Sequence, residues 1–293
     1  FADGVHSVML VRVWKVMMLV SMMSLALRVF SQEHGQPANS TAEPLPGTAF
    51  ATGGGIRKRS YVAALLGSGA WPEASKGAIA TNPLVETKVS GVFRIPGHGV
   101  SDHGIGPWGH VVFEEDSAVL VDVPYFSEEL AQEIRKRAPK GLKYILLTHD
   151  DFVRMSPYRE WKSAFAGQAS SVAHHIDAQD MDILLDGPGP WKVGNFEVHY
   201  TPGHSRGHVF YMHRGLSAVF TGDSFADFHG PTGFPRFCHF ALGSQAASLR
   251  GFAEHIDFVH HVLPSHGLPM SFEDQPERLE AFEEAAADLD GGK

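Results

Sequence analysis

The segment FEVHYTPGHSRGHVFYMHRGLSAVFTGD, residues 196–223, carries the strongest structural signal in the chain. Runs of β-branched and aromatic residues alternate in it with loops that contain Gly, Pro and Ser, which is the pattern of successive short strands. The first run ends shortly before His204 and His208, and the last run ends before Asp223. A strand end can hold a metal-ligating side chain rigidly, so the segment predicts a metal site at the edge of a sheet.

The same arrangement recurs on both sides of this segment. The apolar run 144–147 (YILL) is typical of a buried strand, and the polar residues 149–151 (HDD) follow it. The run 261–263 is likewise followed by His266. Ser127 is expected to cap a helix, because acidic residues follow it in the first turn and basic residues come in the last. Strands are expected over 89–95, 109–113, 118–123, 196–200, 209–212 and 218–220, and helices over 128–137, 244–258 and 272–289.

Composition places the chain among ordinary globular proteins. Hydrophobic residues make up 43% and charged residues 19%, which excludes disorder of the whole chain and the fibrous classes. The net charge of −9 gives no global electrostatic basis for binding nucleic acid, so a small-molecule partner is expected and the oligomeric state stays open. Cys238 is the single cysteine, which excludes an intramolecular disulfide and a multi-cysteine zinc cluster. The 18 histidines indicate instead that imidazole and carboxylate would hold any metal.

Residues 1–84 are predicted to form a targeting leader and linker that is largely disordered. The apolar run 16–27 follows two basic residues and has the length of a signal-peptide core. A second unit has a basic start at 57–59, an apolar middle and a small-residue end at 78–80. Two such units in series resemble the leaders of plastid proteins, so a plastid location is expected. Secretion or membrane anchoring through the leader, and a plain disordered extension, are the alternatives.

Four motifs make the chain resemble the metallo-β-lactamase-fold superfamily between residues 89 and 282. The family's ILLTHxHxDH element resembles residues 145–154, and its TPGHTxGH element resembles residues 201–208. Its FTGD element resembles residues 220–223, and its final loop histidine resembles His266. The resemblance implies an α+β fold, a four-layer αββα sandwich over residues 85–293, with the site at the edge of the two sheets.

The resemblance also implies metal ligands. His149 matches the first histidine of the family motif, His204 a later ligand, Asp223 the bridging carboxylate and His266 the last ligand. Three positions depart from the family: Asp151 stands in place of a histidine, Val153 in place of an aspartate and Arg154 in place of a histidine. A guanidinium has no lone pair to offer a cation, so half of a second metal site is missing.

We therefore expect at most one divalent ion, held by His149, Asp151, His204 and Asp223, with His266 nearby. The carboxylate ligands widen the choice from zinc to iron or manganese, and a metal-free state stays open. Asp223 and Asp150 are the expected catalytic carboxylates. The residues expected to support the ligands or to contact substrate are His208, Ser205, Arg154 and His110.

The implied reaction is hydrolysis of an ester, thioester, lactone or amide by a metal-activated water. A catalytically impaired scaffold or binding protein of the same fold is the first alternative. The second is a serine hydrolase, since residues 203–207 (GHSRG) fit the G-x-S-x-G pattern with Ser205 at its centre. That pattern requires a helix directly after the serine, whereas residues 208–212 (HVFYM) predict a strand.

Overall fold

The structure is a computed structural model that describes residues 84–97, 106–227, 231–232, 240–255 and 259–291. Except for Leu84, the predicted leader lies outside these residues, and so does Cys238. The domain boundary near residue 85 stays a prediction. Among the helices within the described ranges, none is both long and apolar enough to cross a membrane.

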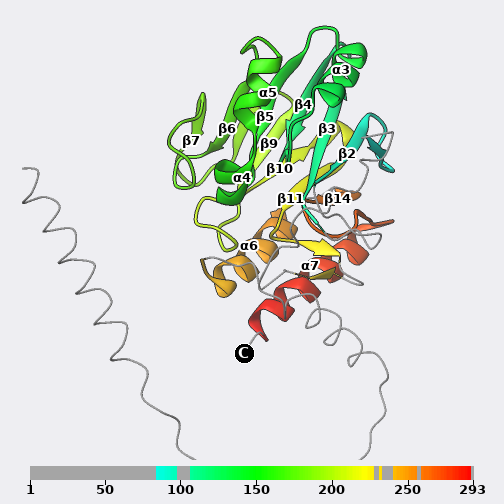
Figure 1. Cartoon of the computed structure of the whole chain (residues 1–293). Helices are drawn as coiled ribbons and strands as arrows, with labels where there is room; N and C mark the ends of the chain where they lie inside the picture. The colour runs from blue at the N-terminus through cyan, green and yellow to red at the C-terminus, as the bar shows by residue number, and fades with distance from the viewer. Residues whose placement is uncertain (1–83, 98–105, 228–230, 233–239, 256–258, 292–293) are drawn as a thin grey trace, which may run out of the picture. The chain divides into compact units, whose positions relative to one another are not determined.

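In the described part of the chain, seven strands form the first sheet in sequence order (Figure 1). Neighbouring strands pair antiparallel from the first strand to the fourth, and they pair parallel from the fourth strand to the seventh. The strands are β1 (Val85–Glu86), β2 (Val92–Pro96), β3 (Trp108–Glu114), β4 (Ser117–Val121), β5 (Leu142–Leu146), β6 (Ser170–His174) and β7 (Ile183–Leu185).

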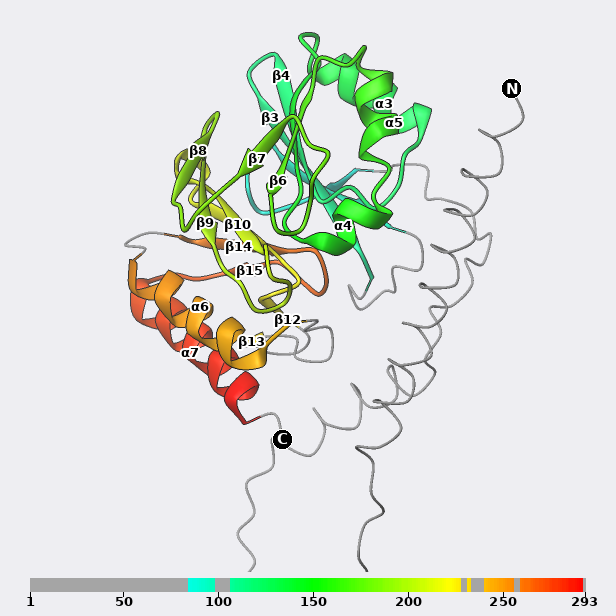
Figure 2. The same ribbon diagram turned by 90° about the vertical axis from the view of Figure 1, so that its left-hand side faces the viewer.

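Helices α3 (Glu128–Arg137) and α5 (Tyr158–Ala164) pack on the outer face of this sheet, and the short α4 (Asp150–Met155) follows β5 (Figure 2). Helix α3 begins as the sequence predicts, because the Ser127 hydroxyl accepts a hydrogen bond from the Leu130 N–H. Leu130 and Ile134 enter the same hydrophobic cluster as Trp161 of α5. Burial of these apolar side chains fixes the helices to the sheet.

Six strands form the second sheet within the described residues, in the order β15-β14-β11-β10-β9-β8. Helices α6 (Leu242–His255) and α7 (Gln275–Asp290) lie side by side on its outer face (Figures 1 and 2). A short hairpin pairs β12 (Ala226–Asp227) with β13 (Pro231–Thr232). The sheet strands are β8 (Trp191–Val193), β9 (Phe196–Tyr200), β10 (Val209–His213), β11 (Ala218–Gly222), β14 (His261–Pro264) and β15 (Met270–Ser271); the 3₁₀ turn η1 (Arg214–Leu216) follows β10.

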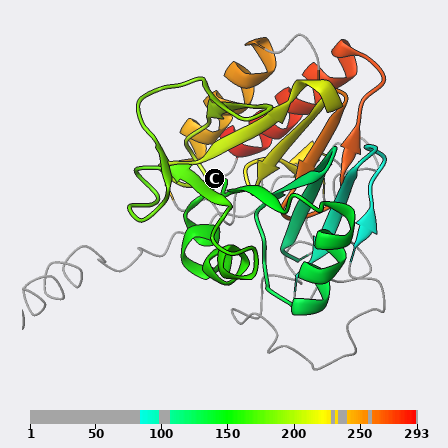
Figure 3. The same ribbon diagram turned by 90° about the horizontal axis from the view of Figure 1, so that it is seen from above.

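The inner faces of the two sheets share one apolar cluster. Val112 and Val119 of the first sheet belong to it together with Tyr211 and Phe220 of the second, all fully buried or nearly so. Helices therefore lie outside two stacked sheets, as the view from above shows (Figure 3). This arrangement confirms the predicted four-layer αββα sandwich.

Two predicted strands are shorter than expected for reasons in the backbone. The run 89–95 begins with a turn, in which Gly91 has φ +78°, and regular pairing starts only at Val92. The run 118–123 ends at Val121, because Asp122 adopts a left-handed conformation with φ +51° that turns the chain out of the sheet.

Parallel pairing brings four strand ends to one edge of the sandwich. Strand β5 runs parallel to β4, and β11 runs parallel to β14, so within each pair the carboxyl ends point the same way. The Val209 N–H also donates to the Thr148 carbonyl, and the Trp108 N–H donates to the Ser265 carbonyl, which tie the two sheets together at this edge. His149, Asp223 and His266 follow the ends of β5, β11 and β14, and His204 follows the end of β9.

Candidate metal centre

Four of the predicted ligands come together at this edge. His149 follows β5, His204 lies in the loop between β9 and β10, Asp223 follows β11 and His266 follows β14. All four side chains are buried. Asp223 lies at the centre of the group. Its Oδ2 is 3.5 Å from Nε2 of His149 and 4.0 Å from Nε2 of His204, and its Oδ1 is 2.6 Å from Nδ1 of His266.

Asp151 completes a candidate ligand set. One donor atom each from His149, Asp151 and His204 lie within 4.8 Å of one another. Asp151 is half-buried, whereas the two histidines are fully buried. The positions of these residues after predicted strands thus indicated which side chains the fold brings together, although their roles stay predictions.

The donor set fits a divalent cation. Ligands about 2.1 Å from a tetrahedral ion lie roughly 3.4 Å from one another, which is near the spacings around Asp223 Oδ2. Nε2 of His208 is buried and has no hydrogen-bond partner among the described residues, and Nε2 of His149 has only the long 3.5 Å contact with Asp223 Oδ2 there. Buried imidazole nitrogens of this kind are normally paired, so the chemistry here suits a cation better than an apolar filling.

A buried aspartate outside the predicted site orients His149. The Thr148 hydroxyl donates to Oδ2 of Asp122 at 2.6 Å, and it lies 2.8 Å from Nδ1 of His149. Since the single hydroxyl hydrogen is used on Asp122, the hydroxyl accepts from the Nδ1–H of His149. Nε2 is thereby directed toward Asp223, the arrangement that metal-ligating histidines require.

Asp122 also joins the two sheets. It accepts hydrogen bonds from the Thr148 N–H at 2.8 Å and from the Ser265 hydroxyl at 2.7 Å. Burial raises the pKa of Asp122, and the charge of His149 and these hydrogen bonds oppose that rise. Sequence reasoning missed this residue. Its signal was one acidic residue within the otherwise apolar run 118–123.

The buried histidines and Asp223 shift one another's pKa values. Burial alone would lower the pKa of His149, but the hydrogen bond and the charge of Asp223, with Asp122 and Asp151, raise it to about 9. Burial alone would raise the pKa of Asp223, but the charge of His266 and the hydrogen bond with His149 hold it well below its ordinary value. A cation bound here would therefore compete with a proton on His149.

Comparison with known proteins identifies the fold. No protein-family model matches the sequence. A metallo-β-lactamase structure from Hirschia baltica is 16% identical with a TM-score of 0.55, and the match covers 69% of this chain and 98% of that one. One from Pontibacter korlensis is 17% identical with a TM-score of 0.54, covering 68% and 98%. One from Erythrobacter litoralis is 17% identical with a TM-score of 0.51, covering 69% and 93%. The chain has the metallo-β-lactamase fold.

The departures from the family motif all lie on α4 of this metallo-β-lactamase fold. Arg154 donates from Nη1 to Oδ2 of Asp150 at 2.9 Å and from Nη2 to Oδ1 of Asp151 at 2.5 Å. Its side chain is 60% exposed. Val153 packs against the cluster under α3 and α5 instead of offering an oxygen to the site.

Ser205 holds a loop in place and lacks the setting of a nucleophile. Its hydroxyl donates to Oδ2 of Asp177, whose Oδ1 accepts from the Gly207 N–H at 2.7 Å. The strand β10 follows at Val209, so the helix that a nucleophile elbow needs is absent from this stretch of described chain. His266 pairs with Asp223. The sequence did not indicate a role for Asp177, because this residue is distant in sequence from residues 201–208.

Two further predicted residues lie beside the centre or beneath it. His208 stacks on His149 with ring centroids 5.4 Å apart, and its Nδ1 is 3.1 Å from the Thr201 hydroxyl. His110 is buried on β3, edge-on to Phe220. Its burial between the sheets favours packing over the predicted substrate contact.

Three other histidines in the described part of the chain lie in packing or surface positions. His199 lies 2.8 Å from a Glu197 oxygen, and His213 lies 3.3 Å from a Glu114 oxygen. His174 stacks on Tyr200 with ring centroids 4.6 Å apart. None of the three belongs to the group of donor atoms around His149.

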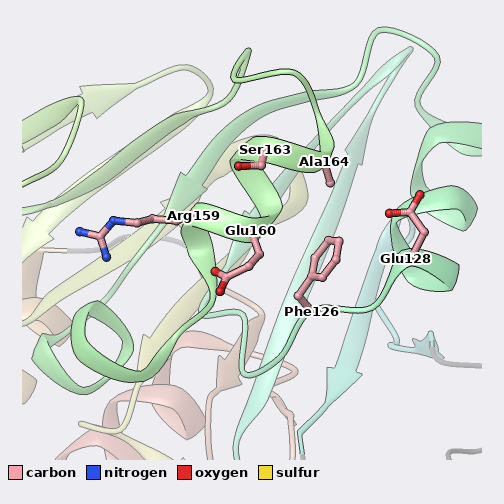
Figure 4. Close-up of a pocket in the computed structure, with 6 residues that line it drawn as sticks. All are labelled: Phe126, Glu128, Arg159, Glu160, Ser163 and Ala164. Carbon is pink, nitrogen blue, oxygen red and sulfur yellow. The ribbon is translucent and has the colours of Figure 1, made fainter.

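A shallow pocket of about 430 Å³ lies elsewhere, between the start of α3 and helix α5 (Figure 4). Its lining residues are Phe126, Glu128, Arg159, Glu160, Ser163 and Ala164. None of the predicted site residues lines it. We therefore place the chemistry at the strand ends and assign no function to this pocket.

Proposed function

We propose that this protein is a metal-dependent hydrolase with a one-metal centre. The observation that carries the proposal is the convergence of His149, His204 and Asp223, each from a different strand end, on one buried point with donor atoms 3.5 and 4.0 Å apart. Asp151 lies within reach of both histidines. The substrate class is an ester, thioester, lactone or amide of a small molecule.

A divalent ion at this point would supply an activated water and polarise a substrate carbonyl. His149 and His204 would bind it through Nε2, and Asp223 would bind it through Oδ2. Asp122 and Thr148 keep Nε2 of His149 aimed at the centre. Asp223 Oδ1 stays on His266, which fixes the plane of the carboxylate. Asp150, with an oxygen that is buried and unpartnered among the described residues, is the candidate to accept a proton from the attacking water.

The mixed ligand set supports iron or manganese as well as zinc. Two imidazoles with carboxylates resemble the ligand chemistry of non-haem iron sites, while zinc more often takes nitrogen and sulfur. We keep all three metals in the proposal.

Metal content of the full-length protein tests the proposal. The protein is dialysed against zinc, manganese or, without oxygen, ferrous iron, and bound metal is measured together with hydrolysis of nitrophenyl ester, thioester, lactone and β-lactam substrates. We expect about one equivalent in the native protein, with loss of metal and activity in His204→Ala. His199→Ala, on a neighbouring strand, is the matched control. A native protein that binds no metal would refute the proposal.

A second candidate, a scaffold of the same fold, is favoured by one observation. Asp223 already has histidine partners on both oxygens, so the site can be electrostatically satisfied without a cation. A preparation whose thermal stability is unchanged by zinc, iron and manganese would support this candidate. A serine hydrolase using Ser205 has no comparable support.

We also propose a plastid location, based on the two signal-like units before residue 84. Imaging of the full-length protein fused to a fluorescent protein at its C-terminus tests it. Accumulation in the secretory pathway would favour the alternative reading of the leader.

A further inference from the structure

Asp151 is shared between the metal cluster and a guanidinium. One of its oxygens lies within 4.8 Å of the donor atoms of His149 and His204. Its Oδ1 also accepts a hydrogen bond from Nη2 of Arg154 at 2.5 Å, while Nη1 of the same arginine donates to Asp150 at 2.9 Å. One guanidinium thus bridges two consecutive carboxylates at the rim of the centre.

The guanidinium of Arg154 is held beside the two carboxylates by the helix and is always charged. Arg154 lies three and four residues after its partners on α4, the spacing at which helical side chains meet. A guanidinium stays protonated at any accessible pH, and it only donates hydrogen bonds. Arg154 is 60% exposed, so the ion pairs contribute little to folding stability, and their main effect is on the charge of the site.

Arg154 lowers the negative charge available to a second cation. Asp150, Asp151 and Asp223 carry three negative charges when ionised, and the ligating histidines are neutral. Arg154 cancels one of these three charges, on the side of Asp150 and Asp151. A second ion would meet a guanidinium on Asp150 and Asp151 and would find Asp223 Oδ1 already paired with His266.

We propose that Arg154 acts as a fixed second cation of this centre, offsetting one of the two negative charges of Asp150 and Asp151 and limiting the chain to one metal ion. The inference rests on the proposed function, since it requires the first ion to bind. Val153, which packs into the hydrophobic cluster, contributes no ligand that would offset this effect.

The test counts manganese ions on the full-length protein. Equilibrium dialysis against Mn²⁺ gives the stoichiometry, and electron paramagnetic resonance distinguishes an isolated ion from an exchange-coupled pair. The variants are Arg154→Gln, which removes the charge, and Arg154→Lys, which keeps it. Arg159→Gln is the matched control, because Arg159 is an exposed arginine on α5 that pairs only with the exposed Asp180 among the described carboxylates.

We expect one ion in the native protein, in Arg154→Lys and in Arg159→Gln, and a second, weaker and exchange-coupled ion in Arg154→Gln. One ion in all four proteins would overturn the role of Arg154 and leave the proposed function standing. Two ions in the native protein would also overturn the role of Arg154. No bound ion in any of the four would overturn both the proposed function and this inference.

Discussion

Asp122 and Thr148 are joined by two hydrogen bonds, one from the main chain of Thr148 at 2.8 Å and one from its side chain at 2.6 Å. Through the second bond the Thr148 hydroxyl becomes an acceptor for His149, whose Nε2 faces Asp223. The relationship ties the first sheet to the candidate metal centre. Asp122 is therefore expected to affect both folding stability and metal binding, although it is not itself a candidate ligand.

Replacing Asp122 by alanine is expected to weaken both properties. The Thr148 N–H and the Ser265 hydroxyl would lose their buried acceptor, which costs about 3 kcal/mol in the free energy of unfolding. Loss of the orienting group behind a metal-ligating histidine lowers metal affinity by about 10- to 100-fold. Urea unfolding and metal titration measure the two effects. Asp116→Ala, which breaks only the exposed pair with Lys140, should change stability by less than about 0.5 kcal/mol.

The stability of the chelated, metal-free protein should pass through a maximum near pH 6.5. The pKa of His149 is raised to about 9, so its contribution is complete below the unfolded pKa and is lost as the pH rises toward 9. The pKa of His208 is lowered by burial and then by the charges of His149 and His204, so protonation of the unfolded chain below about pH 6.5 favours unfolding.

Urea unfolding of the chelated protein between pH 5 and 9 tests this profile. The expected loss from pH 6.5 to 9 is up to about 3 kcal/mol, and His149→Gln should flatten that limb. Stability that rises steadily from neutral pH to pH 9 would contradict the assignment of a proton to His149.

The sequence located the candidate ligands better than the residues that support them. His149, His204, Asp223 and His266 each follow a predicted strand, so strand patterns together with the family motifs located them. Asp122 and Asp177 support the site from positions 26 residues before Thr148 and 28 residues before Ser205. Contacts over such distances depend on strand pairing and on loop conformation, and no local pattern encodes them.

The contacts of Arg154 also depended on three-dimensional structure. The sequence showed that a guanidinium stands at a ligand position, and it excluded Arg154 as a ligand. Helix α4 begins one residue after His149, which places Asp150 and Asp151 one turn before Arg154. The helix therefore decides which carboxylates the guanidinium contacts. The left-handed turn at Asp122 was similarly hidden, since aspartate adopts that conformation only in particular tertiary settings.

Metal affinity should depend on pH already above neutrality. An ion that binds Nε2 of His149 must displace a proton held with a pKa of about 9, so the apparent affinity falls about tenfold per pH unit below 9. This onset is well above the value of about 6.5 expected from an unperturbed histidine. Calorimetric titration with Mn²⁺ at pH 7.5 in buffers of different ionisation enthalpy should detect about one proton released per ion. Binding heat that is the same in all buffers would argue against a protonated His149.

Gly207→Ala is expected to loosen the loop that carries His204. A Cβ at residue 207 would lie 2.7 Å from Cγ of Asp177 and 2.9 Å from its main-chain nitrogen, so Asp177 or the loop must shift. Overpacking of this kind costs about 1–3 kcal/mol, and displacement of His204 should weaken metal binding in parallel. Gly251→Ala is the matched control, because a Cβ on that α6 residue meets nothing within 4 Å. The control should leave metal affinity unchanged and raise stability by about 0.5–1 kcal/mol through helix propensity. Equal metal affinity in both variants would mean that Asp177 does not position His204.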